Sequence, residues 1–109
     1  MQDLQNQHCV PCEGDTVPIT KTDAESKMMK QVAGWTLDGE GKKITRDFLF
    51  KDFKEAMVFV NKVGDIAESE GHHPDIALWW NKVRLDLSTH AIGGLSTNDF
   101  VIAAKVNAL

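Results

Sequence analysis

Three of the four histidines in the chain occur in a pattern that suits proton transfer. His72 and His73 are adjacent and precede Pro74, Glu68 lies four residues before His72, and His90 follows later. Histidine titrates near neutral pH, so an imidazole can both donate and accept a proton at a reacting centre. If helical geometry extends to His72, Glu68 shares its face and can orient the ring or favour its charged form. The pattern therefore predicts an acid–base site.

The same residues leave two other interpretations open. Three histidines with Glu68 or Asp99 have the donor types that zinc prefers. Joint ligation by His72 and His73 is awkward, because adjacent side chains of an extended backbone point in divergent directions. The histidines can also be unrelated surface or core residues. Covalent catalysis is less favoured, because the chain has no Gly-x-Ser-x-Gly motif and neither cysteine lies near the cluster in sequence.

The segment after the paired histidines predicts that His73 and His90 are neighbours. Apolar residues alternate on both sides of Asn81-Lys82, which indicates a β-hairpin, and Asn tolerates the positive φ of a two-residue turn. This turn places Leu78 opposite Leu85 and, carried back along the strand, His73 opposite His90. Directly opposed Cβ atoms lie about 4.5–5.5 Å apart. By alternation both histidines lie on the sheet face away from the expected core.

Five further residues have both a functional and a structural interpretation. Asp99 can serve the site, but it also completes a capping box at the start of the last expected helix. Trp79 and Trp80 can stack on a flat heterocycle or pack in the protein, and alternation assigns Trp80 to the core and Trp79 to the histidine face. Ser88 and Thr89 can donate hydrogen bonds to a ligand or be ordinary strand residues.

Helices and hairpins alternate along the chain. Helices are expected to start at Thr22, Asp52 and Ser96, each followed three residues later by Glu or Asp as in a capping box, and the first two are expected to end at Gly34 and Gly71. Strand-like alternation predicts hairpins over residues 35–50 and 76–87. The order α-β-β-α-β-β-α predicts an α+β fold, with a four-stranded antiparallel sheet and three helices packed on one face.

The composition is that of one ordinary globular domain. The chain has 109 residues, 42% of them hydrophobic and 26% charged. We expect an irregular N-terminal arm over residues 1–21 and a single domain over 22–109. The arm contains a Cys9-x-x-Cys12 pair, to which we assign no chemistry because no strand precedes it. The last helix is apolar nearly all round, so we expect a second subunit to cover part of it.

Charge and hydropathy exclude several classes of partner. The net charge of −4 argues against direct nucleic-acid binding, which needs clustered lysine and arginine. No apolar run approaches the roughly 20 residues of a membrane span. The first 16 residues lack the basic start and apolar middle of a signal peptide, so the cytoplasm is the expected location.

Taken together, these residues resemble the pterin-4a-carbinolamine dehydratases. The resemblance rests on Glu68-x-x-x-His72-His73-Pro74 with His90 and Asp99 at fitting spacings, and it covers roughly residues 33–105. Three surrounding segments also fit, namely Asn81-Lys82-Val83, Leu87-Ser88-Thr89-His90 and Gly94-Leu95-Ser96. The cysteine arm is similar to that of bacterial members associated with phenylalanine hydroxylase.

The resemblance implies dehydration of 4a-hydroxytetrahydropterin to quinonoid dihydropterin, without a metal or other cofactor, which recycles the pterin of aromatic amino acid hydroxylases. It implies a dimer or tetramer of the α+β fold. His72 and His90 become candidates for the acid and the base, in an order left open. His73 would position the pterin and share in the proton transfers, and Glu68 and Asp99 would orient or charge the histidines.

The implied pterin contacts are His72, His73, Pro74, Trp79, Trp80, Ser88, Thr89 and His90. Many relatives have an aromatic residue where this chain has Ile76, so stacking at that position is in question. A second class of function also follows from the resemblance, because animal relatives act as dimerisation cofactors of a transcription factor. The alternative is therefore a protein-binding transcriptional co-regulator.

Overall fold

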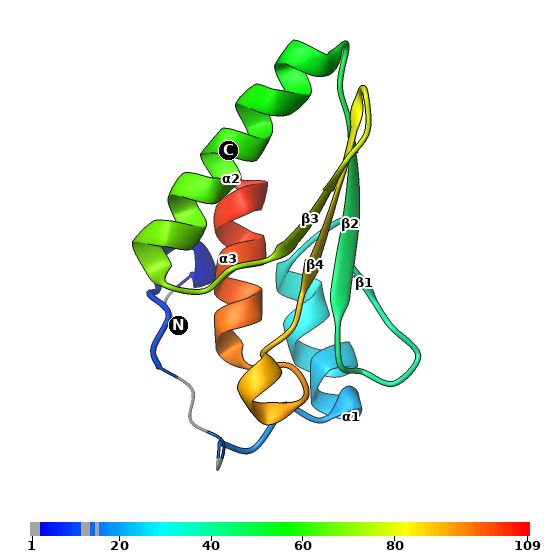
Figure 1. The fold of residues 1–109 in the computed structure, drawn as a ribbon. Helices are drawn as coiled ribbons and strands as arrows, with labels where there is room; N and C mark the ends of the chain where they lie inside the picture. Colours follow the sequence, from blue (N-terminus) through cyan, green and yellow to red (C-terminus); the bar gives the residue numbers. More distant parts are fainter. Residues whose placement is uncertain (1–2, 12–13, 15) are drawn as a thin grey trace.

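The computed structural model describes residues 3–11, 14 and 16–109, and within them the chain forms one four-stranded sheet. The strands are β1 (Thr36–Leu37), β2 (Ile44–Leu49), β3 (Asp75–Leu78) and β4 (Lys82–Leu87). Their order in the sheet is β1-β2-β4-β3, and every neighbouring pair is antiparallel. The helices lie on one side of this sheet (Figure 1), which confirms the predicted α+β architecture.

The helices begin and end at residues that satisfy their free backbone groups. The first helical segment runs through α1 (Lys21–Asp23), a π-helical turn η2 (Ala24–Met28) and a 3-10 turn η3 (Met29–Gln31). Its cap is Thr20, whose side chain accepts from the N–H of Asp23, so the predicted cap at Thr22 is wrong. Gly34 follows at φ +88°, in the left-handed region expected there.

The two longer helices have the predicted caps. Helix α2 (Phe53–Glu70) starts where Asp52 accepts from the N–H of Glu55 at 2.9 Å. It ends at Gly71, whose φ of +67° turns the chain away from the helix axis. Helix α3 (Thr97–Asn107) starts with the Ser96–Asp99 capping box. These caps fix the positions of His72 and Asp99 at adjoining helix ends.

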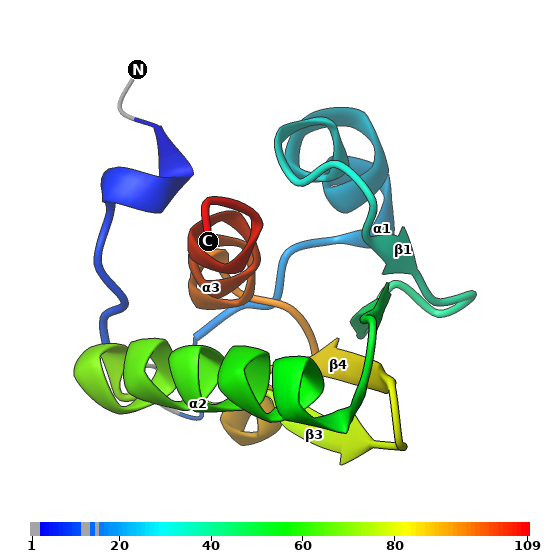
Figure 2. The same ribbon diagram turned by 90° about the horizontal axis from the view of Figure 1, so that it is seen from above.

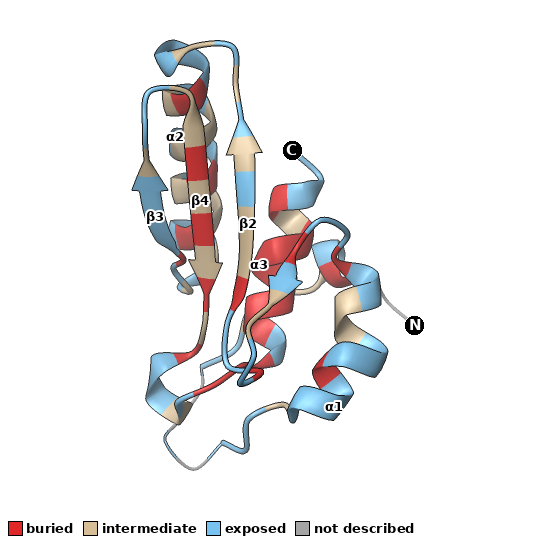
Figure 3. Cartoon of the chain, turned by 90° about the vertical axis from the view of Figure 1, so that its right-hand side faces the viewer, coloured by how far each residue is buried: buried red, intermediate tan, exposed pale blue. Residues whose placement is uncertain are grey.

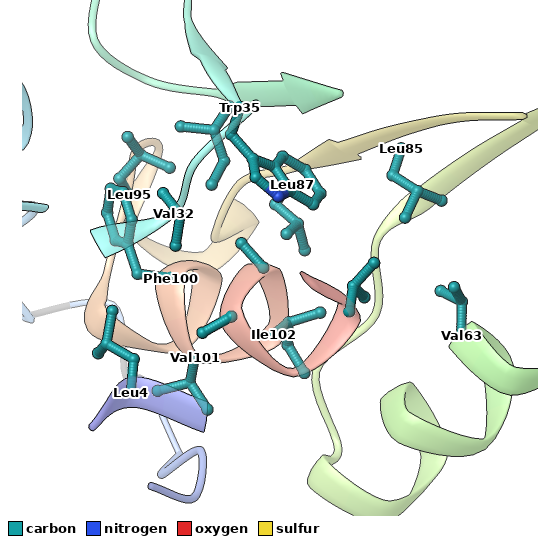
Figure 4. Close-up of a cluster of buried hydrophobic side chains, with 14 of the residues drawn as sticks. Leu4, Val32, Trp35, Val63, Leu85, Leu87, Leu95, Phe100, Val101 and Ile102 are labelled. Atoms are coloured by element: carbon teal, nitrogen blue, oxygen red, sulfur yellow. The ribbon is translucent and has the colours of Figure 1, made fainter. Parts of the chain in front are cut away.

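Helix α3 is the centre of the core. Nearly all of its residues are buried, and the view along its axis shows it enclosed by α2, the sheet, the first helical segment and the N-terminal turn η1 (Leu4–Asn6) (Figure 2). Leu4 of that turn is itself buried, on the side of α3 that carries Val101 (Figure 4). The chain itself therefore buries α3, partly through its N-terminal arm, and the apolar character of α3 is explained without a second subunit.

The β3–β4 hairpin has a register two residues away from the predicted one. Leu78 pairs with Val83, and the N–H of Trp79 donates to the carbonyl of Lys82, so Trp80 and Asn81 form the turn. The predicted pairing of His73 with His90 is therefore wrong. The reason is the turn geometry: no non-glycine residue in the described part of the chain has a positive φ, so the argument from Asn81 does not apply.

A register shift of two residues leaves the faces of the strands unchanged. Val83, Leu85 and Leu87 of β4 are fully buried and alternate with partly exposed residues (Figure 3). Two apolar residues of this hairpin lie outside the core: Ile76 is 41% exposed, and Trp80, which alternation assigned to the core, is 64% exposed in the turn.

Candidate acid–base site

A pocket of about 570 Å³ brings all three predicted histidines together. Four segments form it: the N-terminal arm, the end of α2, the end of β4 with the 3-10 turn η4 (His90–Ile92), and the first turn of α3. The lining residues are Cys9, Val10, Pro11, Glu70, Gly71, His72, His73, Ser88, Thr89, His90, Ala91 and Asn98. The histidines line one pocket because the end of α2 and the end of β4 converge, and not through the cross-strand pairing that the sequence suggested.

His72 is held by a buried carboxylate. Its Nε2 lies 2.6 Å from Oδ1 of Asp99, whose side chain is completely buried, while 13% of the His72 side chain is exposed. Because an ionised carboxylate only accepts hydrogen bonds, Nε2 carries the hydrogen in this pair. The other ring nitrogen, Nδ1, is then the one that can exchange a proton with a bound molecule. This is the geometry in which a carboxylate fixes the tautomer and orientation of a catalytic imidazole.

Asp99 is in turn fixed by two donors on its other oxygen. Oδ2 accepts from the hydroxyl of Thr89 at 2.8 Å and from the backbone N–H of Ser96 at 3.0 Å. The Thr89 hydrogen is used in that bond, so the neighbouring Ser96 hydroxyl, 2.8 Å away, donates to Thr89. Asp99 therefore caps its helix and orients His72 at the same time, with one oxygen for each task.

His73 pairs with Glu68 at the pocket's exposed edge. Its Nε2 lies 2.5 Å from Oε2 of Glu68, and both side chains are more than half exposed. The expected contact between Glu68 and His72 does not form, because Gly71 ends the helix before His72. The two neighbouring histidines thus have separate carboxylates, one buried and one exposed to solvent.

His90 is exposed, as His73 is. It starts η4, which Gly93 ends at φ +66°, and its ring has no hydrogen-bond partner among the described residues. Its position in the lining leaves the ring available to a ligand rather than to the protein. The pocket therefore combines one imidazole paired with a buried carboxylate, one paired with an exposed carboxylate, and one without a hydrogen-bond partner in the described part of the chain.

The other predicted contact residues divide into two groups. Thr89 is buried beside Asp99, and Ser88 lines the pocket although its hydroxyl donates to the Lys42 carbonyl at 2.8 Å. Pro74, Trp79 and Trp80 do not line it. Pro74 is buried, and the two tryptophans lie at the other end of β3, about 16 Å of extended strand away, where Lys82 and Arg84 pack over the Trp79 ring.

The N-terminal contribution to the pocket is the part that sequence reasoning missed. Cys9, Val10 and Pro11 line the cavity, and Glu70 and Asn98 hold them there. The backbone N–H of Cys9, followed by the ring of His8, keeps the pKa of Glu70 below its usual value. Cys12, the second member of the cysteine pair, lies outside the described residues. The one sequence signal for this contribution is the carboxylate of Glu70, two residues before His72.

The arrangement differs from that of a metal centre. Across residues 3–11, 14 and 16–109, no group of three or more histidine, cysteine, aspartate or glutamate side chains converges on one point where an ion could bind. In the same part of the chain, no helix combines the length and apolar character needed to cross a membrane.

Comparison with known proteins identifies the family. Residues 17–109 match the profile of the family described as Pterin 4 alpha carbinolamine dehydratase. The chain belongs to this family. Named members of the pterin-4-alpha-carbinolamine dehydratase family are hydro-lyases.

Individual relatives are similar to this chain over most of its length. A protein of Aromatoleum aromaticum, provisionally named pterin-4-alpha-carbinolamine dehydratase, is 48% identical over 107 residues, which cover 98% of this chain and 95% of that protein. Pterin-4-alpha-carbinolamine dehydratase 2, mitochondrial, of Arabidopsis thaliana is 43% identical over all of this chain and 60% of its own. The crystal structure of a transcriptional coactivator/pterin dehydratase from Brucella melitensis superposes with a TM-score of 0.78 at 32% identity, covering 84% of this chain and 96% of that one.

Proposed function

We propose that the chain dehydrates 4a-hydroxytetrahydropterin to quinonoid dihydropterin by histidine acid–base catalysis. The observation that carries the proposal is the buried Asp99–His72 pair, which opens into a pocket that His73 and His90 also line. The family membership supports a pterin as the substrate. In this role the chain would regenerate the pterin cofactor of aromatic amino acid hydroxylases.

The reaction needs two proton transfers and no oxidant. The C4a hydroxyl takes a proton and leaves as water, and N5 loses its proton as the C4a=N5 double bond forms. His72 and His90 divide these two transfers, one as acid and one as base. Each such group typically contributes about 10²- to 10⁴-fold to the rate.

The carboxylates support the histidines. Asp99 holds His72 in one tautomer and stabilises the ring when it is charged. His73, which pairs with Glu68 at the open edge of the pocket, positions the pterin and takes part in the proton transfers. The pterin contacts in this proposal are His72, His73, Ser88, Thr89 and His90.

The test is to follow decay of 4a-hydroxytetrahydropterin spectroscopically with purified protein, with and without EDTA. We expect acceleration over buffer that EDTA does not change. No acceleration would refute the enzymatic proposal, and loss of the rate with EDTA would favour metal catalysis instead. His90→Ala should remove most of the acceleration while thermal unfolding stays unchanged, because the His90 ring contacts no described residue through a hydrogen bond.

A second candidate is a protein-binding co-regulator, and the Brucella melitensis relative titled a transcriptional coactivator supports it. We also propose that the chain acts as a homodimer or homotetramer, because several large apolar side chains are exposed, among them Leu49, Phe53, Val58 and Leu109. Sedimentation at micromolar concentration tests the oligomeric state, and a monomer throughout would contradict it.

A further inference from the structure

The N-terminal arm passes over the histidine pocket and is fixed there by two side chains that have no part in the proton transfers. Asn98 forms two hydrogen bonds with the backbone of Val10: Nδ2 donates to its carbonyl at 2.6 Å, and Oδ1 accepts from its N–H at 3.0 Å. Only 5% of Asn98 is exposed. A buried amide thus pairs with the arm as a neighbouring strand would.

Glu70 holds the preceding residues. Its Oε1 accepts from the N–H of Cys9 at 2.8 Å, and its Oε2 accepts from Nδ1 of His8 at 3.0 Å. Only 6% of the Glu70 side chain is exposed, and the ammonium of Lys105 lies 3.7 Å from the same carboxylate. A carboxylate this buried is stable only with donors around it, and the arm supplies two of them.

Glu70 and Asn98, which together we call the clamp, lie at the same two helix ends as the His72–Asp99 pair. Glu70 lies two residues before His72, and Asn98 immediately precedes Asp99. The last residue of α2 and the second residue of α3 therefore contact the arm, and His72 and Asp99 lie just beyond them in the sequence. The result is that Cys9, Val10 and Pro11 line the same cavity as the histidines.

We propose that Cys9–Pro11 is a wall of the pterin site, and that Glu70 and Asn98 are positioning residues that set the affinity for the pterin. The proposal rests on the proposed function for the identity of the ligand. Val10 and Pro11 present apolar surface to a flat heterocycle in the cavity that they share with the histidines. The clamp residues do not touch the reacting atoms, so they act on binding more than on the chemical step.

The first test is kinetic. Releasing the arm removes its apolar contact with the pterin, and a loss of about 1.4 kcal/mol of binding free energy corresponds to about a tenfold rise in KM. We expect Asn98→Ala and Glu70→Ala each to raise KM by about this factor while kcat stays nearly constant. The matched control is Asn107→Ala, because Asn107 also lies on α3 and donates to a backbone carbonyl, that of Ala33, outside the pocket. An unchanged KM in both clamp variants would overturn the positioning role.

The second test does not depend on turnover. In a Cys12→Ser background Cys9 is the remaining thiol, and its alkylation by iodoacetamide is followed by mass spectrometry with and without biopterin. We expect biopterin to slow alkylation several-fold, and Asn98→Ala to speed it in the absence of biopterin. An alkylation rate that biopterin does not change would show that the arm is not a wall of the site.

The two proposals can fail separately. If the wild-type chain does not accelerate dehydration but biopterin protects Cys9, the proposed function fails and the wall stands. If the chain is active but biopterin leaves Cys9 equally reactive, the wall is refuted and the proposed function stands.

Discussion

Replacing Asp99 by asparagine separates the two tasks that its carboxylate performs. One oxygen accepts from His72, and the other accepts from Thr89 and from the backbone of Ser96. An asparagine side chain has a single oxygen, so its NH₂ group must face one set of existing donors. With the NH₂ group toward Thr89 and Ser96, it meets the backbone N–H of Ser96; with the NH₂ group toward His72, Nε2 can accept only if the ring takes the other tautomer.

The size of the effect follows from this geometry. A buried donor left without an acceptor costs about 1–3 kcal/mol, so we expect Asp99→Asn to lower the free energy of unfolding by about 2–3 kcal/mol. His72 also loses the charge that fixes its tautomer and supports its charged form. We therefore expect kcat to fall by about 10²- to 10³-fold, which corresponds to about 3–4 kcal/mol of barrier.

The control variant is Ser96→Ala. It removes the hydroxyl of the helix cap, which costs about 1 kcal/mol, but it leaves the backbone N–H of Ser96 and the pairing of His72 with Asp99 in place. We expect its kcat to stay within about threefold of wild type. Both rates are measured as dehydration of 4a-hydroxytetrahydropterin, at a temperature where circular dichroism shows each variant folded. If the two variants lose kcat equally, Asp99 is only a cap and the reasoning fails.

Three other perturbations test different parts of the structure. The folded state holds the pKa of Glu70 below its ordinary value of 4.5, because the backbone N–H of Cys9 donates to its carboxylate. This interaction stabilises the fold above that pH, and the stabilisation is lost as the pH falls through the lower pKa of the folded state. Thermal melts from pH 7 to pH 3 should therefore show a smaller loss of stability in acid for Glu70→Gln than for wild type, and equal slopes would contradict this. Gly34→Ala should lower the free energy of unfolding by about 1 kcal/mol or more, because φ is +88° there. Gly64→Ala, in open space on α2, should raise it by about 0.5–1 kcal/mol. Urea unfolding that gives both changes the same sign would argue against the structure. Leu4→Ala should cost about 2 kcal/mol because Leu4 is buried against α3, and an unchanged melting temperature would show that the arm does not pack there.

The fold was predictable because local signals agree with the global arrangement. Asp52 and Ser96 begin their helices as capping residues should, and Gly71 ends α2 in the left-handed conformation that the sequence suggested. The strand faces also follow from alternation, as the buried Val83 and Leu85 show. These features depend on a few neighbouring residues, which a single sequence contains.

The errors come from features that depend on contacts across the molecule. The hairpin turn lies one residue earlier than Asn81 suggested, because turn type depends on how both strands pack. Pattern alone could not show that the arm covers α3 through Leu4, since the contact is distant in sequence. For the same reason the conditional pairing of Glu68 with His72 does not form: Asp99 contacts His72, and Glu68 contacts His73.

The sequence predicted which histidines belong to the site, but it did not predict how they are arranged in space. His72, His73 and His90 do meet in one pocket, but through the convergence of the α2 and β4 ends. Trp79 and Trp80 were expected at the ligand because of their chemistry, and the structure places them at the far end of the hairpin. The residue types therefore indicated the chemistry, whereas the distances between the side chains could be obtained only from the folded structure.

The most direct test of the proposed function is the dehydration rate of 4a-hydroxytetrahydropterin with wild-type protein and with His72→Ala at neutral pH. The structure gives His72 the buried carboxylate, so we expect the variant to lose about 10²- to 10⁴-fold in kcat, measured at a temperature where circular dichroism shows it folded. A variant that keeps the wild-type rate would contradict acid–base catalysis by this pocket.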